Sequence, residues 1–418
     1  MEMKTHSYIL LCLAILVIAG CNSARRSAQK PVKGKNEFQV KHLSEANNYF
    51  AADLFKQIHP GSENIIYSPY SITNILALIY GGASGKTADE IRDVFYFPEN
   101  QLLLHAAVKS HRASMDSIDL TPGTELGLAN AVWAQENFIF LPEYFELSRD
   151  FYEAPLELVD FIQTGRREEN RIRINDWVSK NTNQRIQDLI QPGVLTENTR
   201  LVLTNAIYFN GKWMYPFDKS STSSSVFHVS MGETVKTVFM NQTRTFPYYE
   251  DEEVQAISLP YRGGRMSMLI ILPKKVEGWK MVSRVLDYDR IRRVASGMED
   301  TEVQLALPRF RSELRINLRN ELISMGMEQA FSRDADLSGM TGEKNLFISE
   351  IIHKAFIEVT EAGTEAAAAT AGIIALKSAL SEKPVQFNAD HPFIYLLIDE
   401  VSGCVIFIGR LVRPSEIV

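Results

Sequence analysis

The amino-acid sequence predicts one large α+β domain behind an export signal. Apolar residues recur at helical spacing in the first part of the chain. Short apolar runs typical of strands dominate the later part, without the alternation of βαβ units. Of the 418 residues, 45% are hydrophobic and 23% are charged, which excludes a disordered, collagenous or disulfide-based chain. Acidic residues outnumber basic ones by 51 to 44, so we expect no nucleic-acid partner.

Residues 1–20 are typical of a signal peptide. Lys4 precedes an apolar stretch, residues 7–19, that is too short to span a bilayer as a helix. Small residues ending at Gly20 stand directly before Cys21, an arrangement that resembles the cleavage box of bacterial lipoproteins. That resemblance implies a lipid on Cys21 and a membrane-anchored protein that faces the periplasm or the cell exterior. The alternative is an ordinary signal peptide, a chance cysteine and an extracellular protein.

Residues 21–36 are predicted to tether the lipid to the domain. After Cys21 this segment holds five basic residues and no acidic one, which favours a solvated chain near anionic lipid headgroups. The other cysteines are Cys12, in the segment to be removed, and Cys404, within an apolar run. One remaining thiol forms no internal disulfide, and apolar neighbours predict that Cys404 is a buried structural residue.

Two helices are predicted near the start of the domain, which spans residues 37–418. Residues 40–58 place apolar side chains on one helical face, and the His-Pro-Gly sequence that follows ends the helix. Ser68 then has the character of a helix cap, with Pro69 in the first turn and isoleucine and leucine residues at helical spacing up to residue 79.

Strands are predicted mainly in the second half of the chain. Each candidate is an apolar run bounded by proline, glycine or charged residues. The candidates are Leu201 to Phe209, Met268 to Leu272, Val303 to Leu307, Ile351 to Val359, Phe393 to Ile398 and Val405 to Ile408.

Catalytic and cofactor motifs give no support for an enzyme. Residues 80–87 read YGGASGKT, one residue away from a phosphate-binding P-loop, but tyrosine occupies the place of the first glycine and a helical pattern precedes it. The chain has no GxSxG, HExxH or CxxC motif, and its 8 histidines lack metal-ligand spacing. We therefore expect no catalytic activity, no metal and no cofactor.

The most unusual segment is residues 361–372, EAGTEAAAATAG. Taken alone, an alanine-rich run favours a helix. Predicted strands stand on both sides of it, however, and it contains two glycines and two threonines, so an extended segment remains open.

At this point the chain, from about residue 37 to the C-terminus, resembles the serpin family. The resemblance rests on five segments in order, each modest alone. They are Asn64 to Ile72, Thr204 to Trp213, His353 to Phe356, the alanine-rich segment and Phe387 to Phe393.

The resemblance implies a fold of three β-sheets with eight or nine helices and an exposed reactive loop, here about residues 361–386. It implies a monomeric suicide inhibitor of serine endopeptidases, with cysteine endopeptidases left open. A protease attacks a bait bond in the loop and becomes acylated. The cut loop then inserts into the largest sheet and distorts the protease before it deacylates. The alternative is a non-inhibitory serpin that acts as an extracytoplasmic chaperone or carrier.

The hinge of that loop matches inhibitory serpins except at Ala362, where the family usually has a charged or polar residue. If Thr364 faces inward in the inserted strand, strand alternation sends Ala366, Ala368 and Thr370 inward as well, while Glu365 faces solvent. We expect Thr364 to be exposed before cleavage. The matching hinge residues are Glu361, Gly363, Thr364, Glu365, Ala366, Ala367, Ala368, Ala369 and Thr370.

The bait bond is assigned by counting from the hinge glutamate. In the family the bait residue is the seventeenth, which gives Lys377 followed by Ser378. A lysine suits a trypsin-like pocket with an acidic floor, so the expected target is a trypsin-like serine protease. Loop lengths vary, and cleavage after Leu376 or at Ala379 would leave Lys377 as a solvated loop residue.

Five further residues match family sites. Ser68, Ser71, Asn205 and His353 align with the polar cluster beneath the sheet that must open, which we call the shutter. Trp213 aligns with the aromatic residue at the top of that sheet, which we call the breach. The simpler explanations are helix capping for the serines, a satisfied core amide for Asn205 and a core tryptophan for Trp213.

Overall fold

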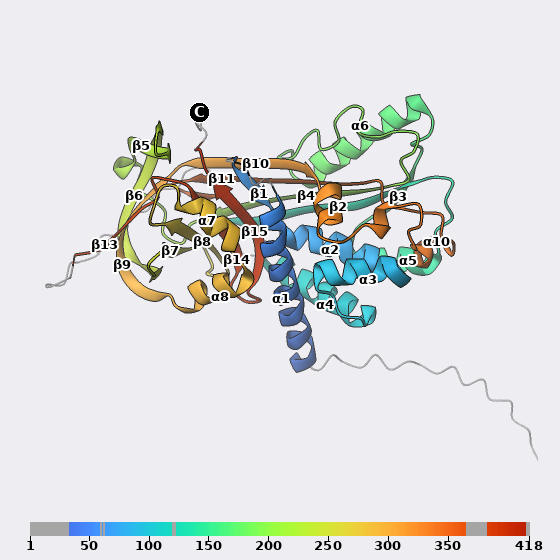
Figure 1. The fold of residues 1–418 in the computed structure, drawn as a ribbon, viewed down its shortest axis with the longest axis horizontal. Coiled ribbons are helices and arrows are strands. Elements are labelled where there is room, and N and C mark those ends of the chain that lie inside the picture. Colours follow the sequence, from blue (N-terminus) through green and yellow to red (C-terminus); the bar gives the residue numbers. More distant parts are fainter. Residues whose placement is uncertain (1–32, 59–60, 62, 119–122, 365–382, 415–418) are drawn as a thin grey trace, which may run out of the picture.

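The protein folds as two β-sheets with helices packed around them. The computed structural model describes residues 33–58, 61, 63–118, 123–364 and 383–414. A six-stranded sheet runs along the long axis, and a nine-stranded sheet occupies one end of the molecule (Figure 1). Helices α2 to α5 lie on one side of the six-stranded sheet, and α6 lies on the other (Figure 1).

Ten α-helices are present in the described residues, and several have only one or two turns. The family resemblance implied eight or nine, and the short helices account for the difference. They are α1 (Lys33–Gln57), α2 (Pro69–Tyr80), α3 (Gly85–Phe95), α4 (Gln101–Met115), α5 (Pro142–Leu147), α6 (Thr164–Asn181), α7 (Gly278–Val285), α8 (Tyr288–Ser296), α9 (Arg319–Ser324) and α10 (Ser338–Thr341).

The two helices predicted early in the chain are present. Helix α1 begins at Lys33, inside the segment predicted as a tether. Helix α2 starts as predicted: the Ser68 hydroxyl accepts a hydrogen bond from the Ser71 amide, and Pro69 occupies the first turn. None of the helices in the described part of the chain is long and apolar enough to cross a membrane.

The strands contain every apolar run that the sequence analysis singled out. They are β1 (Ile65–Tyr67), β2 (Thr124–Gln135), β3 (Leu156–Val159), β4 (Leu201–Lys212), β5 (Ser223–Ser230), β6 (Glu233–Glu250), β7 (Val254–Pro260), β8 (Met266–Pro273), β9 (Glu299–Pro308), β10 (Phe310–Asn317), β11 (Glu350–Thr360), β12 (Gly363–Thr364), β13 (Val385–Asn388), β14 (Phe393–Asp399) and β15 (Cys404–Leu411).

The six-stranded sheet contains a junction between β11 and β4 that a short third strand, β12, enters from one end. Its order is β10-β11-β12-β4-β2-β3. Strands β11 and β4 are parallel and pair directly from Glu350 opposite Val202 to Phe356 opposite Tyr208. Beyond Phe356 and Tyr208, toward the C-terminal ends of both strands, β11 and β4 diverge. The two residues of β12 lie between them and run antiparallel to both. We call the line between β11 and β4 the seam.

The nine-stranded sheet joins two of the three sheets that the resemblance implies. Strand β6 is 18 residues long; it pairs with β9 along most of its length and with β7 at its end. Because β6 is hydrogen-bonded both to β7 and to β9, the strands on its two sides form one continuous sheet. The strand order of the whole sheet is β1-β15-β14-β8-β7-β6-β9-β13, and β5 pairs with β6 outside this order.

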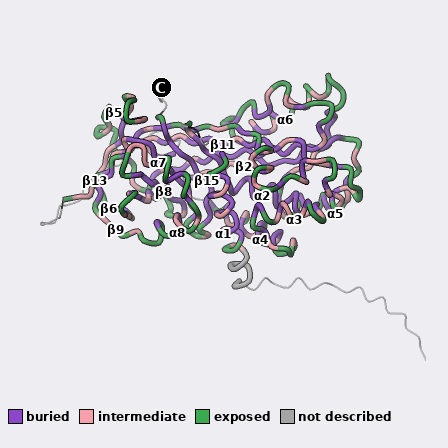
Figure 2. Tube along the Cα trace, viewed as in Figure 1, coloured by how far each residue is buried: buried purple, intermediate pink, exposed green. Residues whose placement is uncertain are grey.

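The core lies on both faces of the six-stranded sheet. Buried residues follow the strands, and exposed residues lie on the outer helices and the strand tips (Figure 2). Helix α6 contributes Ile174 and Val178 to a cluster that includes Val202 of β4 and Ile352 of β11. The outer face of the seam is thus covered by apolar packing, which must yield if the seam opens.

Candidate functional site: hinge and seam of the six-stranded sheet

The hinge already enters the sheet in the uncut chain. Gly363 pairs with Thr360 on one side and Lys212 on the other, and Thr364 pairs with Val359 and Gly211. Two residues therefore occupy the first positions of a new strand, while the seam below them is closed. A strand that continued past Thr364 would have to part β11 from β4.

Only glycine fits at position 363. Its φ of 145° lies in a region that side chains rarely adopt. A Cβ atom there would lie 2.0 Å from the Gly211 carbonyl oxygen and 2.6 Å from the Lys212 Cα atom. The glycine in the family pattern thus has a local cause, which is the close approach of two backbones at the top of the seam.

Glu361 is clamped before the hinge enters the sheet. Its carboxylate accepts hydrogen bonds from the Arg309 guanidinium, with a distance of 2.9 Å from Nε to Oε1, and from the Thr222 hydroxyl at 2.8 Å. Its side chain is almost fully buried. Burial alone would raise the pKa of Glu361, but hydrogen bonds from Arg309, from its own backbone amide and from Thr222 outweigh burial and lower that pKa. The loop base is thereby fixed to the residue between β9 and β10 and to the residue that precedes β5.

The breach is built from two stacked rings. Trp213 packs on Tyr261 with ring centroids 4.4 Å apart and an interplanar angle of 19°. The Trp213 indole N–H donates to the Thr360 carbonyl at 3.0 Å, and its amide donates to the Ala362 carbonyl at 3.0 Å. Trp213 is buried as a core tryptophan would be, and it also holds the backbone on both sides of the turn into the hinge.

The expectation that Thr364 is exposed before cleavage is wrong. The residue is fully buried in the uncut chain, and its hydroxyl is 2.5 Å from the Tyr261 hydroxyl. The inward direction predicted for Thr364 agrees with this position. The exposure was mispredicted because β12 already pairs with both neighbours, and its partners on β4, Gly211 and Lys212, are more than 100 positions away in sequence.

The four shutter residues form one buried network with a fifth, Asn130. The Asn205 amide donates to the Ser71 hydroxyl and to the Asn130 carbonyl oxygen, both at 2.6 Å. The Ser71 hydroxyl donates to Asn130 at 3.1 Å, and the Ser68 hydroxyl donates to the Ile406 carbonyl at 2.6 Å. Ser68 therefore caps α2 and also belongs to the buried network, which Ser71 joins through its amide and its hydroxyl.

Asn130 was missed by the sequence analysis. It lies on β2 directly opposite Asn205 of β4, so its amide joins the same buried pair. The available signal was an asparagine in the middle of the apolar run LANAVWA. A buried amide in such a run requires partners, and the sequence alone does not identify them.

His353 bridges the seam. It lies opposite Asn205 in the β11–β4 register, and its Nδ1 bonds the Asn205 carbonyl oxygen. The Ser68 backbone amide donates to its Nε2 at 3.1 Å, so the ring is neutral with its proton on Nδ1. Burial lowers the pKa of His353 to about 3. Because a strand inserted at this level must separate His353 from Asn205, the bond holds the seam closed.

The neutral state of His353 predicts that stability falls in acid. The folded-state pKa of about 3 lies below the ordinary value of 6.5, so the unfolded chain binds the proton more tightly. The contribution of neutral His353 to the free energy of unfolding is fully present above pH 6.5 and is lost as the pH falls toward 3. It amounts to about 3 kcal/mol between pH 7 and pH 4. Urea unfolding of wild type and His353→Gln across that range should show a shallower pH dependence in the variant.

The control for this measurement is His42→Gln, at an exposed position on α1. Its pH dependence should follow that of wild type. Equal slopes for His353→Gln and wild type would show that His353 is not a buried neutral group.

Several predicted site residues lie outside the described part of the chain. They are Cys21, Glu365, Ala366, Ala367, Ala368, Ala369, Thr370, Lys377 and Ser378. Cys404 is described and is fully buried, which agrees with its prediction as a structural thiol. Burial raises the pKa of Cys404 well above its usual range. The described residues contain no group of three or more metal-ligating side chains.

Comparison with known proteins identifies the family. The family model described as "Serpin (serine protease inhibitor)" matches residues 45–414. A serpin-like protein of Thermococcus kodakarensis is 39% identical, over 91% of this chain and 88% of its own. Leukocyte elastase inhibitor A of Mus musculus is 36% identical, over 90% of this chain and 100% of its own.

A solved structure gives the same result. The crystal structure of a highly specific serpin of the insect Tenebrio molitor matches with a TM-score of 0.80 and 33% identity, over 90% of this chain and 98% of that one. The chain therefore belongs to the serpin family.

Proposed function

We propose that this serpin inhibits trypsin-like serine endopeptidases as a suicide substrate. The observation that carries the proposal is β12: the hinge already lies between β11 and β4, in register with both strands. The inserted strand would continue that antiparallel pairing downward. The elastase inhibitor among its relatives supports inhibition rather than a carrier role.

In the proposed mechanism, cleavage of the bait bond comes first and insertion of the loop follows. The target's serine would attack the Lys377 carbonyl, the bond to Ser378 would break, and the new amine would leave with a proton. The residues after Thr364 would then replace the direct β11–β4 bonds with bonds along both of their own edges. Opening the seam breaks the Asn205–His353 contact. Insertion must outpace hydrolysis of the acyl-enzyme for the protease to be trapped.

The test is a covalent complex. Incubation with trypsin should give an SDS-stable species at the summed mass of protease and large inhibitor fragment. A carrier or chaperone would be cut without forming that species. Matched incubations with chymotrypsin-like, elastase-like and papain-like enzymes, followed by mass mapping of the cut, define the bait bond and show whether cysteine endopeptidases are also trapped.

Replacing Lys377 should change specificity. Lys377→Ala removes the positive charge that an acidic trypsin-like pocket binds, so trypsin inhibition should fall by about a hundredfold or more. Inhibition of elastase-like enzymes should persist or improve, and measured inhibition rates for both enzymes provide the comparison. An unchanged rate with trypsin would place the bait bond at a neighbouring residue, with cleavage after Leu376 or at Ala379.

We also propose that the exported protein is a monomer anchored through a lipid on Cys21. Removal of residues 1–20 and acylation of the new N-terminus would leave the domain outside the cytoplasm on the tether. Intact-mass measurement of the exported protein should show loss of the first 20 residues and added acyl mass. In Cys21→Ser the acyl mass should be absent and the protein should leave the membrane fraction. An unmodified Cys21 would contradict the anchor and leave the inhibitory proposal intact.

A further inference from the structure

A pocket of about 570 Å³ lies between α1 and the turn that follows α3. Tyr49 and Ala46 of α1 form one wall, and Tyr96 and Phe97 form the other. This pocket is separate from the hinge and the shutter, and none of its lining residues takes part in either.

Tyr96 has an unusual backbone for its residue type. It caps α3 in the left-handed region, with φ of 56° and ψ of 32°, where glycine or asparagine is usual. A bulky residue there is strained, and such strain is concentrated at functional sites. The side chain is 43% exposed, and its hydroxyl donates to the Asp53 carboxylate at 2.6 Å. The strained backbone and the Asp53 bond together fix this ring at the pocket wall.

The neighbouring rings form a row. Tyr49 contacts Tyr96 with centroids 5.3 Å apart and, on its other side, Tyr288 of α8 at 5.0 Å. Tyr49 is only half-buried. The Tyr49 and Tyr96 rings therefore contact each other where the two walls of the pocket meet, and the faces of tyrosine rings attract cations.

The charge at the rim is unbalanced. Arg92 is fully engaged by two carboxylates: Asp89, with Nη1 to Oδ1 at 2.6 Å, and Asp93, with Nη2 to Oδ1 at 2.9 Å. Glu45 also lines the pocket, and among the described residues it has no ion pair or hydrogen bond. The other titratable side chain at the rim is the exposed His42. One arginine thus pairs with two carboxylates, and Glu45 adds a third carboxylate without an ion-pair partner in the described part of the chain, so negative charge is in excess beside the tyrosine rings.

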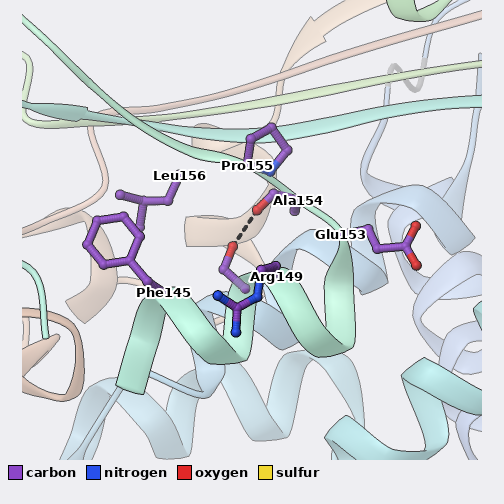
Figure 3. Close-up of a pocket in the computed structure, with 7 residues that line it drawn as sticks. Phe145, Arg149, Glu153, Ala154, Pro155 and Leu156 are labelled. Carbon is purple, nitrogen blue, oxygen red and sulfur yellow. Dashed lines mark hydrogen bonds between the residues drawn. The ribbon is translucent and has the colours of Figure 1, made fainter. Parts of the chain in front are cut away.

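A second pocket differs from the pocket between α1 and α3 in how its charged groups are paired. It has a volume of about 380 Å³ and lies beside β3, at the end of the molecule opposite β13 (Figures 1 and 3). There the Ser148 hydroxyl donates to the Ala154 carbonyl (Figure 3). Arg149 pairs with Asp150, which does not line the pocket. Glu153 pairs with Arg112, so each charged side chain that lines this pocket already has an ion-pair partner.

We propose that the pocket between α1 and α3 binds a small organic cation, an ammonium group on a short apolar frame. The Tyr49 and Tyr96 rings would contact its apolar, positively charged surface, and Glu45 would supply the counter-charge. This activity is independent of protease inhibition. The cation could be a free amine or the headgroup of a lipid, since α1 directly follows the segment that would carry the anchor.

The test uses choline chloride and the full chain in isothermal titration calorimetry. Choline should bind, and dimethylbutanol, its uncharged carbon isostere, should bind about tenfold more weakly or not at all. Glu45→Gln, which keeps the shape, should weaken choline binding about tenfold, and Tyr49→Leu should abolish it. Glu143→Gln, at an exposed position on α5, is the matched control and should bind like wild type.

The outcomes separate the explanations. Absence of choline binding, equal binding of the two isosteres, or an unchanged affinity in Glu45→Gln would each overturn the proposal. Melting temperatures of the variants show whether Tyr49→Leu still folds, and Glu45→Gln tests the site without removing a ring. Inhibition of trypsin should be unchanged in every variant, which keeps this proposal distinct from the inhibitory one.

The source of the cation is resolved with vesicles. Cys21→Ser protein, which lacks the proposed anchor, is added to vesicles of phosphatidylcholine or of phosphatidylglycerol. Preference for phosphatidylcholine that is lost in Glu45→Gln assigns the site to a lipid headgroup. Choline binding without such a preference assigns it to a free amine.

Discussion

Cleavage of the reactive loop is expected to raise the melting temperature of the protein by tens of degrees. Most proteins lose stability when nicked. Here the cut frees the residues after Thr364 to continue the strand that β12 has begun. Each added backbone hydrogen bond contributes about 1 kcal/mol net, and a full strand forms them along both edges. The small side chains at 366, 368 and 370 would be buried against the core below the sheet.

Calorimetry of intact and trypsin-cut protein measures this effect directly, with guanidinium added if the intact form melts too high. A second readout is unfolding in guanidinium, in which the cut form should have the higher midpoint. The uncut form is then a metastable state, held by the kinetic barrier of seam opening. If the cut protein melts at or below the intact one, insertion does not occur in this chain.

Local patterns predicted the elements of the sheets well. Each apolar run bounded by proline, glycine or charge became a strand, because burial on both faces leaves few other uses for such runs. The start of α2 at Ser68 and Pro69 was also predictable, because a helix cap depends only on residues that are neighbours in sequence. How β6 joins two sheets was not predictable in this way, because that depends on the pairing of a long strand with two partners far apart in sequence.

The resemblance named site residues but gave no information on what each of them contacts. Glu361, Gly363 and Trp213 were singled out by resemblance, and the structure gives each a physical role through Arg309, Gly211 and Thr360. None of these partners could be paired from sequence alone.

The absence of long-range pairing information explains both the wrong expectation that Thr364 is exposed and the failure to identify Asn130. The burial of Thr364 is decided by its pairing with Gly211 and by the Tyr261 hydroxyl. The role of Asn130 is decided by the β2–β4 register. Register and long-range pairing were the missing information.

Thr364→Arg should convert the inhibitor into a substrate. Thr364 is fully buried against Tyr261 before cleavage, so the arginine would be expelled from the seam and would take β12 out of the sheet. The rest of the fold should persist, because β11 and β4 still pair below. After cleavage the strand could advance only by burying an unpaired guanidinium, at a cost of several kcal/mol. Insertion should then be slower than deacylation, and the protease should escape.

The measurement is the number of inhibitor molecules consumed per protease trapped, which should rise by about tenfold or more, since each 1.4 kcal/mol added to the insertion barrier slows insertion tenfold. The cut Thr364→Arg protein should also show a smaller gain in melting temperature than the cut wild type.

Two matched variants separate burial from other effects. Glu365→Arg adds the same side chain one position later, where strand alternation directs it to solvent, so inhibition should change little. Thr364→Val keeps the shape of the buried side chain but removes the hydroxyl that meets Tyr261; inhibition should survive, with only a modest loss of stability in the uncut form. Because the alternation fixes which of the two arginines must be buried, equal behaviour of Thr364→Arg and Glu365→Arg would mean that the inserted strand does not continue the register of β12.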